Sequence, residues 1–576
     1  MKSFALVAAG MALTAAAERP NVVLIMTDDQ GYGDFGFTGN KIFETPHADK
    51  MAAENTFVEN FYVSPVCSPT RASLMTGRYN GRTGVVDTWM GRSVMNPAET
   101  TLAELLKANG YATSIYGKWH LGDSYPARSM DQGFDENLVH LGGGIGQPCD
   151  KFGYEGRYTD PILYHNGEQI VKKGYCTDIF FEESIAWMKQ QQKLGKPFFT
   201  YIAPNAPHSP FHDVPEALYR KYLKKDLGSL ITYPEKIKDE KHLAREVDNL
   251  ARIGAMITNI DDNMGKLGKF LEDSGLAENT IVLFMTDNGP NTYRYAGGYK
   301  NKKSAVEKAG IRTPLLIKWN KLKKGVIKSS PVAHIDIFPT LAAACGVEVP
   351  KANFKLDGQN ILPLINEGKK IERDLVIQFH RGTKLNREEN FTIFNSEWKL
   401  NHQTMYMPKG MDEPFHLYRN DDKEQKDVYA EYPEQVKKMM KIYHKWFDDI
   451  EASRPEPTVA IVGTEHEKIT MLTRQDFIWV DGNSWYGKAS GYWPIQTEGG
   501  FYKITVHTEA SDKPIDAVLT YKGLKKKFTF PANATSVTFK DIKLEGGKGD
   551  MECKMKYHDH ERGAYQIILE RNWKRK

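Results

Sequence analysis

Two apolar runs of the same character stand far apart in the chain. Residues 21–27 read NVVLIMT and residues 280–286 read TIVLFMT. Both are rich in β-branched residues and neither alternates with polar positions, which is typical of strands buried on both faces of a largely parallel sheet. Each run ends in Thr, and then in acidic or amide residues and a turn. The pattern predicts two similar strands, each buried on both faces of the sheet.

Strand and helix patterns alternate around these two runs. Residues 112–116 and 198–203 predict further strands. Residues 101–109 predict a short helix, with leucines on one face and a glycine directly after its end. This alternation predicts a layered α/β domain over residues 18–369, built on a large mixed sheet.

The longest helical pattern covers residues 244–273. Its apolar positions recur with the period of an amphipathic helix. Gly254 and Gly265 fall inside it, and glycine is a poor helix former. We therefore expect the helix to break near one of these two glycines.

The pattern changes in the last third of the chain. Residues 374–379 and 390–394 predict short strands, and residues 433–449 predict a helix. Together they indicate a smaller α+β subdomain over residues 370–455. The sequence RPEP at residues 454–457 is typical of a linker.

Residues 456–576 differ again, because short alternating segments are separated by Gly, Asn and Pro turns about ten residues apart. This spacing predicts an appended C-terminal β-sandwich. The segment holds the large aromatic residues Trp479, Trp485, Tyr486, Tyr492 and Trp493. They either fill the core of the sandwich or form a surface that stacks on sugars.

The N-terminus predicts export. Lys2 precedes an apolar stretch over residues 4–13, and small residues at 15–17 offer a cleavage site, so residues 1–17 read as a secretory signal peptide. The apolar stretch is too short to span a membrane. We expect an exported protein, periplasmic or secreted, without a membrane anchor.

The overall charge is nearly balanced. The 576 residues include 77 basic and 73 acidic side chains, with a net charge of +4. A dedicated nucleic-acid-binding protein usually concentrates its basic residues on one face. The composition therefore argues against a nucleic-acid partner.

Acidic and amide side chains follow the two predicted buried strands. Asp28 and Asp29 end the first, and Asp287 and Asn288 end the second. Ligands of open α/β sheets collect beyond the carboxyl ends of the strands. Converging carboxylates repel unless a cation joins them, and an all-oxygen set favours Ca²⁺ or Mg²⁺. The alternative for either pair alone is turn capping.

The pentapeptide CSPTR at residues 67–71, followed by ASLMTGR, is the most specific motif in the chain. Taken alone, Cys67 also fits a buried structural cysteine. The motif resembles the signature of the type I sulfatases, in the alkaline-phosphatase-like superfamily. Further resemblance lies in four segments and extends over roughly residues 20–450: NVVLIMTDDQGYGDFGFTGN, GYATSIYGKWHLG, PNAPHSPF and LFMTDNGP.

The resemblance implies a modified nucleophile and a metal ion. In that family a separate formylglycine-generating maturation enzyme oxidises the cysteine to an aldehyde, whose hydrate attacks the sulfur of a sulfate ester. Here the converted residue would be Cys67. The resemblance also implies one Ca²⁺, with ligands Asp28, Asp29, Asp287, Asn288 and the formylglycine at position 67.

The remaining roles come from the matched segments. Arg71 would orient the attacking hydroxyl, and Lys118 and Lys303 would hold the sulfate oxygens. His208 is the candidate general acid for the leaving alcohol, and His120 the candidate base that allows sulfate to be expelled. Counting back from the Ile-Arg-Thr-Pro sequence selects Lys303, but the Glu-Gly-Gly of the family is altered here and the neighbouring Lys302 stays open.

With Cys67 set aside, four cysteines remain: Cys149, Cys176, Cys345 and Cys553. An oxidising compartment permits disulfides, with three connectivities for four cysteines. We expect a Cys149–Cys176 bond as the local pairing. The alternative is four separate reduced thiols.

The sequence thus predicts an exported, calcium-dependent formylglycine sulfatase that acts on a sulfated carbohydrate. Two alternatives stay open. The same scaffold and nucleophile can serve a phosphoester or phosphonate hydrolase. A protein whose cysteine is never matured would instead be a non-catalytic glycan-binding protein.

Overall fold

The computed structural model describes residues 19–350, 355–379, 381, 386–405, 414–420, 422–481, 489–557 and 560–575. The predicted signal peptide, Trp485 and Tyr486 lie outside these residues. No helix in the described part of the chain is both long and apolar enough to cross a membrane.

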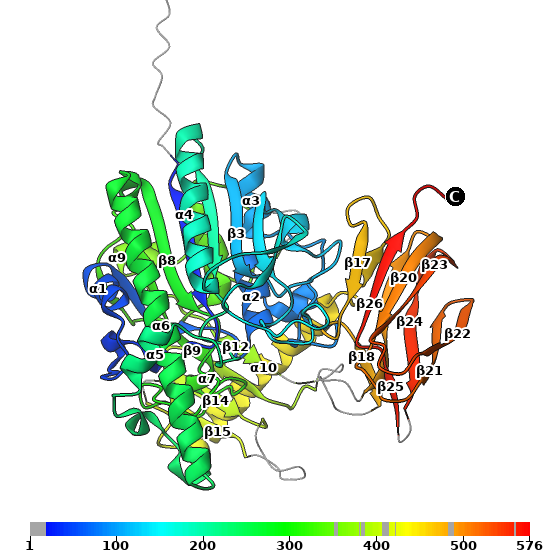
Figure 1. Ribbon diagram of the computed structural model, residues 1–576. Coiled ribbons are helices and arrows are strands. Elements are labelled where there is room, and N and C mark those ends of the chain that lie inside the picture. The colour runs from blue at the N-terminus through cyan, green and yellow to red at the C-terminus, as the bar shows by residue number, and fades with distance from the viewer. Residues whose placement is uncertain are drawn as a thin grey trace, which may run out of the picture.

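A mixed sheet, with eleven strands in the described residues, forms the centre of the protein (Figure 1). β1 (Asn21–Thr27) and β8 (Thr280–Thr286) run parallel at its middle, with Thr27 opposite Thr286. All seven residues of each strand are buried, which confirms the two similar buried strands. In order, the sheet contains β10 (Gly325–Ile327), β2 (Thr56–Tyr62), β9 (Arg312–Lys318), β8, β1, β7 (Phe198–Ala203), β3 (Ala112–Lys118), β4 (Glu136–His140), β5 (Ile162–His165) and β6 (Glu168–Val171), with β11 (Val332–Ala333) beside β2.

Helices cover both faces of this sheet, because successive residues of its buried strands point to opposite sides. Leu24 of β1 faces one apolar core and Ile25 the other. The first core contains residues of α2 (Cys67–Thr76), α3 (Leu102–Ala108), α8 (Ile337–Ala344) and α9 (Leu362–Glu367). The second contains residues of α1 (Pro46–Glu54), α4 (Cys176–Leu194) and α6 (Glu240–Asp273), and α5 (Glu216–Tyr222) packs on α6. The layered α/β architecture is the predicted one.

Helix α6 is continuous over all 34 of its residues, so the predicted break is wrong. Gly254 and Gly265 serve close packing instead. A Cβ added to Gly254 would lie 2.8 Å from the ring of Tyr222, and one added to Gly265 would lie 2.5 Å from the ring of His47. Packing on the rest of the domain holds the helix together despite the weak propensity of glycine.

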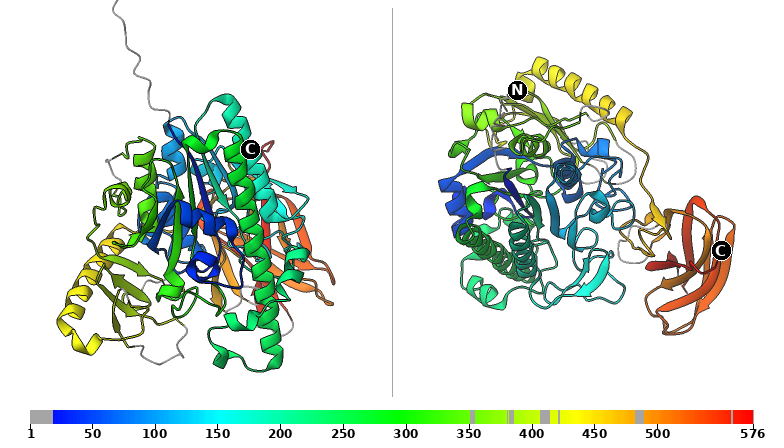
Figure 2. Two further views of the ribbon diagram at one scale, coloured as in Figure 1. Left: turned by 90° about the vertical axis from the view of Figure 1, so that its left-hand side faces the viewer. Right: turned by 90° about the horizontal axis from the view of Figure 1, so that it is seen from above.

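A second, four-stranded sheet follows in the chain. It is antiparallel, with strands β12 (Leu375–Gln378), β13 (Phe391–Phe394), β14 (Trp398–His402) and β15 (His416–Arg419). Helix α10 (Pro433–Ser453) packs on it through a common apolar core. Figure 2 shows α10 along the outside of the molecule. A short helix, α7 (Lys308–Ile311), precedes β9 of the main sheet.

Two further sheets enclose one core and form the predicted sandwich, which lies beside the main body (Figure 2). One contains β16 (Ala460–Val462), β19 (Ser490–Thr497), β24 (Gly547–Lys556), β21 (Ile515–Tyr521), β22 (Leu524–Phe530), β18 (Ile478–Asp481) and β25 (Glu561–Gly563). The other contains β17 (Ile469–Leu472), β26 (Gln566–Arg571), β20 (Gly500–His507) and β23 (Ser536–Leu544). Helix α10 ends at Ser453 and β16 begins at Ala460. We keep the division of the chain at 369/370 and 455/456 as a proposal.

Two of the predicted aromatic residues of the sandwich, Trp493 and Trp479, serve packing. Trp493 is fully buried in the core. Trp479 packs against that core and also contacts Trp89 of the main body, with ring centroids 4.8 Å apart. Tyr492 is half-buried on β19.

All five cysteines are free and buried, so the predicted Cys149–Cys176 disulfide is wrong. Cys149 lies against a loop, where its thiol donates to the Leu141 carbonyl at 3.3 Å. Cys176 begins α4 and packs in the core between that helix and the sheet. Nearness in the sequence does not bring these two thiols together.

Candidate active site

The four residues that end β1 and β8 form one buried cluster. The parallel register of these strands brings their carboxyl ends to the same edge. The amide N–H of Asp29 donates to Asp287 Oδ1 at 3.2 Å, and Asn288 Nδ2 donates to Asp29 Oδ1 at 2.8 Å. Asp28, Asp29, Asp287 and Asn288 are all fully buried. The structure therefore brings together the predicted metal-binding side chains.

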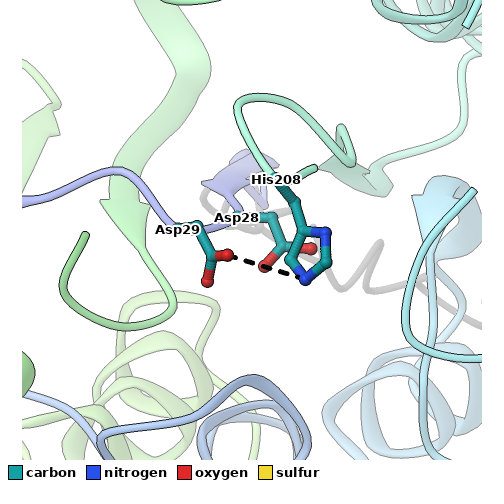
Figure 3. Close-up of side chains that lie close together, drawn as sticks. All are labelled: Asp28, Asp29 and His208. Carbon is teal, nitrogen blue, oxygen red and sulfur yellow. Dashed lines mark ion pairs between the residues drawn. The ribbon is translucent and has the colours of Figure 1, made fainter. Parts of the chain in front are cut away.

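Several oxygens of this cluster lack a hydrogen-bond donor. Asp28 Oδ1, Asp29 Oδ2 and Asn288 Oδ1 are buried without a hydrogen-bond partner in the described structure. Leaving a buried acceptor unsatisfied is costly. Figure 3 shows the two aspartates beside the ring of His208, and ligand atoms of these three residues lie within 4.8 Å of one another. A hard cation would satisfy such oxygens, so the donor set fits Ca²⁺.

Cys67 completes this edge of the site. It is the first residue of α2, and burial raises the pKa of its thiol. Its Sγ lies 3.3 Å from Nδ1 of His120, and within 4.8 Å of ligand atoms of Asp28 and Asp287. The start of a helix carries a partial positive charge. Position 67 therefore joins the acidic cluster, a histidine and a helix N-terminus.

Each of the three carboxylates forms an ion pair with one cationic side chain. The ion pairs are Arg71 with Asp287 at 2.7 Å, Lys118 with Asp28 at 2.5 Å and Lys303 with Asp29 at 2.6 Å. The first four of these side chains and Asp29 are buried, whereas Lys303 is 16% exposed. Arg71 also donates to the Lys118 carbonyl and to the hydroxyl of Tyr201.

The carboxylates respond differently to their surroundings. Burial, together with repulsion from Asp28, raises the pKa of Asp287 to about 6. Burial also acts to raise the pKa of Asp29, but the charge of Lys303 and then His208 lower it below its usual range. Two carboxylates that share a site resist ionising together. A bound cation would favour the ionised form of Asp287.

His120 presents an unprotonated nitrogen to position 67. Its Nε2 lies 3.0 Å from the carbonyl oxygen of Thr88. A carbonyl can only accept, so Nε2 carries the ring proton and Nδ1 keeps a lone pair toward Cys67. Burial, and then the charge of Lys118, lower the pKa of His120 well below its ordinary value. The ring is neutral at physiological pH and can accept a proton.

His208 lies beside the acidic cluster. Its Nε2 is 3.6 Å from Asp29 Oδ2 (Figure 3). Its Nδ1 donates to the Ser209 carbonyl at 2.7 Å. Burial lowers the pKa of His208 to about 4, although Asp29 opposes the shift. His208 must therefore gain a proton before it can donate one. A bound anion favours that step because it stabilises the charged ring.

Residues 20–347, more than half of the chain, match the family model described as "Sulfatase". The chain belongs to the sulfatase family. Its fold is the predicted alkaline-phosphatase-like one, and the enzyme class is that of the sulfuric ester hydrolases. Residues 297–452 match a second model, described as the C-terminal part of N-sulphoglucosamine sulphohydrolase. The C-terminal sandwich lies beyond both matched segments.

Named relatives are also sulfatases. The chain is 31% identical over 414 residues to the N-acetylgalactosamine-6-sulfatase of Sus scrofa, covering 66% of this chain and 72% of that protein. It is 30% identical over 369 residues to the ulvan-active sulfatase of Formosa agariphila, covering 62% and 68%. The solved structure of Ps i-CgsB in complex with k-i-k-neocarrahexaose is 28% identical, with a TM-score of 0.63 over 76% of this chain and 94% of that one.

The structure of this sulfatase distinguishes the two neighbouring lysines. Lys303 reaches Asp29 in the acidic cluster. Lys302 points elsewhere, since its ammonium donates to the Asn291 carbonyl at 3.1 Å and lies over the ring of Tyr293. Lys303 is therefore the lysine placed at the site of the sulfatase.

Other parts of the sulfatase site carried no usable signal in the sequence. His140 ends β4 beside Lys118 of β3, is buried, and has an unpartnered Nε2 in the described structure. The run of glycines at residues 142–144 lies against the rings of His120 and His208. A Cβ added to Gly143 would lie 2.7 Å from His120 Cε1, and one added to Gly144 would lie 3.3 Å from His208 Cε1. In the sequence this run indicates only a turn, because its partners are far away along the chain.

Proposed function

We propose that this sulfatase hydrolyses sulfate esters of a carbohydrate, using a formylglycine formed from Cys67 and one bound Ca²⁺. The observation that carries the proposal is the placement of position 67 between an unprotonated His120 nitrogen and a cluster of buried oxygens without donors. A separate maturation enzyme would convert the cysteine before or during export.

Five positions would hold the calcium ion: Asp28, Asp29, Asp287, Asn288 and residue 67. The carboxylates of Asp28, Asp29 and Asp287 are balanced by Arg71, Lys118 and Lys303, so the formal charge of the cluster is zero. A sulfate monoester is an anion. A bound dication would supply Lewis-acid polarisation of a sulfate oxygen and a positive site for the substrate.

The side chains divide the remaining work. A formylglycine at position 67 supplies a hydrated aldehyde, which offers one hydroxyl for attack on sulfur and a second whose deprotonation lets sulfate depart. Arg71 orients the first hydroxyl, and Lys118 and Lys303 neutralise sulfate oxygens. His120 accepts a proton at Nδ1, and His208 donates one at Nε2 to the leaving alcohol.

The carbohydrate substrate and export rest on separate observations. The relatives above are named for N-acetylgalactosamine 6-sulfate and for ulvan, and the solved structure binds a neocarrahexaose. Residues 1–17 have the pattern of a secretory signal peptide. We propose that the enzyme meets its substrate in the periplasm or outside the cell, where polymeric sulfated glycans occur.

Mass spectrometry of the peptide containing Cys67 tests the nucleophile. The protein is produced with a formylglycine-generating enzyme, and sulfate release is measured on N-acetylgalactosamine 6-sulfate and on ulvan and carrageenan oligosaccharides. We expect an aldehyde at position 67 and sulfate release from at least one of them, with nearly all turnover lost in Cys67→Ala. An active protein with an unmodified thiol would contradict the proposal. Faster hydrolysis of a matched phosphate ester would show a phosphoester hydrolase instead.

Removal of the metal is a second test. Chelation is expected to abolish activity and lower the melting temperature, because an ion that binds only the folded state at 100 times its Kd stabilises it by about 2.7 kcal/mol. Asp287→Ala should remove most of that stabilisation. Elemental analysis that finds zinc, or no metal in active protein, would overturn the calcium assignment.

A further inference from the structure

One residue of the C-terminal sandwich reaches into the active site. Gln475 lies in the turn between β17 and β18 and is only 2% exposed. Its side-chain Nε2 lies 2.6 Å from the carbonyl oxygen of Thr88, 3.0 Å from Ser93 Oγ and 3.2 Å from His120 Nε2. All three neighbours belong to the main body, more than 350 residues earlier in the chain.

The turn that carries Gln475 is held on both sides. Within the sandwich, Trp493 Nε1 donates to the Thr473 carbonyl at 2.6 Å, and Arg474 Nη2 donates to the Gly563 carbonyl at 2.9 Å. Toward the main body, the Arg474 amide donates to Pro148 and the Gly91 amide donates to the Gln475 carbonyl, each at 3.3 Å. These contacts fix the backbone position of Gln475, from which its side chain extends into the site.

The Thr88 carbonyl links Gln475 to His120. A carbonyl oxygen has two lone pairs and cannot donate. Thr88 therefore accepts from the amide of Gln475 and from Nε2–H of His120 at the same time, and these two donor nitrogens, 3.2 Å apart, make no hydrogen bond to each other. The second bond fixes the proton on Nε2, which leaves Nδ1 as the acceptor that faces Cys67 Sγ. The bond from Gln475 holds the Thr88 carbonyl in the position where it accepts the proton on Nε2 of His120.

Neighbouring contacts confine the same group of atoms. A Cβ added to Gly142 would lie 3.1 Å from Gln475 Oε1, and one added to Gly143 would lie 2.7 Å from His120 Cε1. Trp479 of the sandwich packs on Trp89, directly after Thr88. The backbone of residues 142–143 and the segment that carries Thr88 thus enclose the glutamine and the histidine together.

We infer that Gln475 is a positioning residue for the sulfatase reaction, and that the C-terminal sandwich is part of the active site rather than a separate appendage. Gln475 holds the Thr88 carbonyl, which in turn keeps Nδ1 of His120 directed at residue 67 as a proton acceptor. This inference rests on the proposed function, in which His120 accepts a proton from the formylglycine hydrate.

Gln475→Met tests the inference, because methionine has a similar shape and no amide donor. We expect kcat for sulfate release to fall roughly 10- to 100-fold, the usual cost of losing a group that orients a functional histidine. KM should not change, because the contact does not touch the substrate. Gln475→Glu is a second variant, since an ionised carboxylate cannot donate to Thr88 and should cause a similar loss.

Gln566→Met is the matched control. Gln566 is also a buried glutamine of the sandwich, and its Nε2 donates to the main body at the Asp150 carbonyl, 3.4 Å away. It has no contact with His120, so its loss should leave kcat unchanged. Equal losses in the Gln566 and Gln475 variants would overturn the inference, because they would indicate a general effect of the interface. Unchanged kcat in both Gln475 variants would overturn it as well.

A readout that does not need turnover separates this inference from the proposed function. Ring-¹⁵N histidine spectra, with His120 assigned through His120→Gln, report which ring nitrogen carries the proton. We expect the Nε2-protonated form in the wild type and a mixture of forms in Gln475→Met. A single unchanged form in the variant would refute the positioning role. Absence of sulfate release from the wild type on every ester would refute only the proposed function.

Discussion

At the scale of single residues, two members of the site have backbone conformations that residues other than glycine rarely adopt. Asp29 has φ of 60° and His120 has φ of 58°, in the left-handed region. Such a conformation costs of the order of 1–3 kcal/mol and persists where the surroundings enforce it. Here Asp29 is held by Asp287 and Asn288, and His120 by Thr88. Contacts from elsewhere in the fold fix the directions of both side chains.

The two adjacent lysines permit a sharp comparison. Lys303→Met should lower kcat by roughly 10²–10³-fold, the usual cost of removing one group that stabilises transition-state charge. Lys302→Met should have little effect, because its ammonium contacts a carbonyl and a tyrosine ring away from the cluster. Steady-state sulfate release measures both. Comparable losses in the two variants would show that Lys303 has no special role.

The role of His208 predicts a dependence on the leaving group. A poor leaving group such as a sugar alcohol needs protonation, whereas an activated aryl alcohol departs with less help. His208→Ala should therefore reduce kcat/KM far more for a sugar sulfate than for an aryl sulfate. The measurement compares both substrates in wild type and variant. A uniform loss would assign His208 to binding or to the metal site.

At the scale of elements, helix α6 offers a matched pair of glycines. In Gly254→Ala the new methyl group would lie 2.8 Å from Tyr222 and 3.0 Å from Phe43, whereas nothing lies within 4 Å at Gly268. Overpacking costs about 1–3 kcal/mol, so Gly254→Ala should lower the melting temperature despite the better helix propensity of alanine. Gly268→Ala should increase the free energy of unfolding by about 0.5–1 kcal/mol and so raise the melting temperature. A higher melting temperature in both variants would show that the neighbours of Gly254 yield easily.

At the scale of the whole molecule, the sandwich packs on the main body through Gln475 and Trp479. Deletion after residue 456 removes Gln475 and exposes Trp89. We expect this truncation to lose activity on a small aryl sulfate as well as on a polysaccharide, and to melt at a lower temperature. If the sandwich served only to bind the polysaccharide, its deletion would leave the activity on the aryl sulfate unchanged. Retention of full aryl sulfatase activity would therefore contradict the structural role.

The sequence by itself determined the features that local patterns encode. The apolar runs at 21–27 and 280–286 predict buried strands, and the side chains after them are expected at one edge of the sheet because parallel strands end at one edge. The motif at 67–71 and the segments around Lys118, His120 and His208 predict candidate chemistry through their similarity to the sulfatases. The structure brings these side chains together, while their individual roles stay predictions.

Only the tertiary structure decided the features that depend on contacts between distant residues. A glycine in a helical pattern looks like a break, and only the rings of Tyr222 and Phe43 show that Gly254 makes room instead. The four cysteines other than Cys67 look pairable in the sequence, and only the fold shows them as free, buried thiols. No sequence motif marks Gln475 as a residue of the site. Its place beside His120 follows from how the sandwich packs on the main body, and no local pattern of residues records that packing.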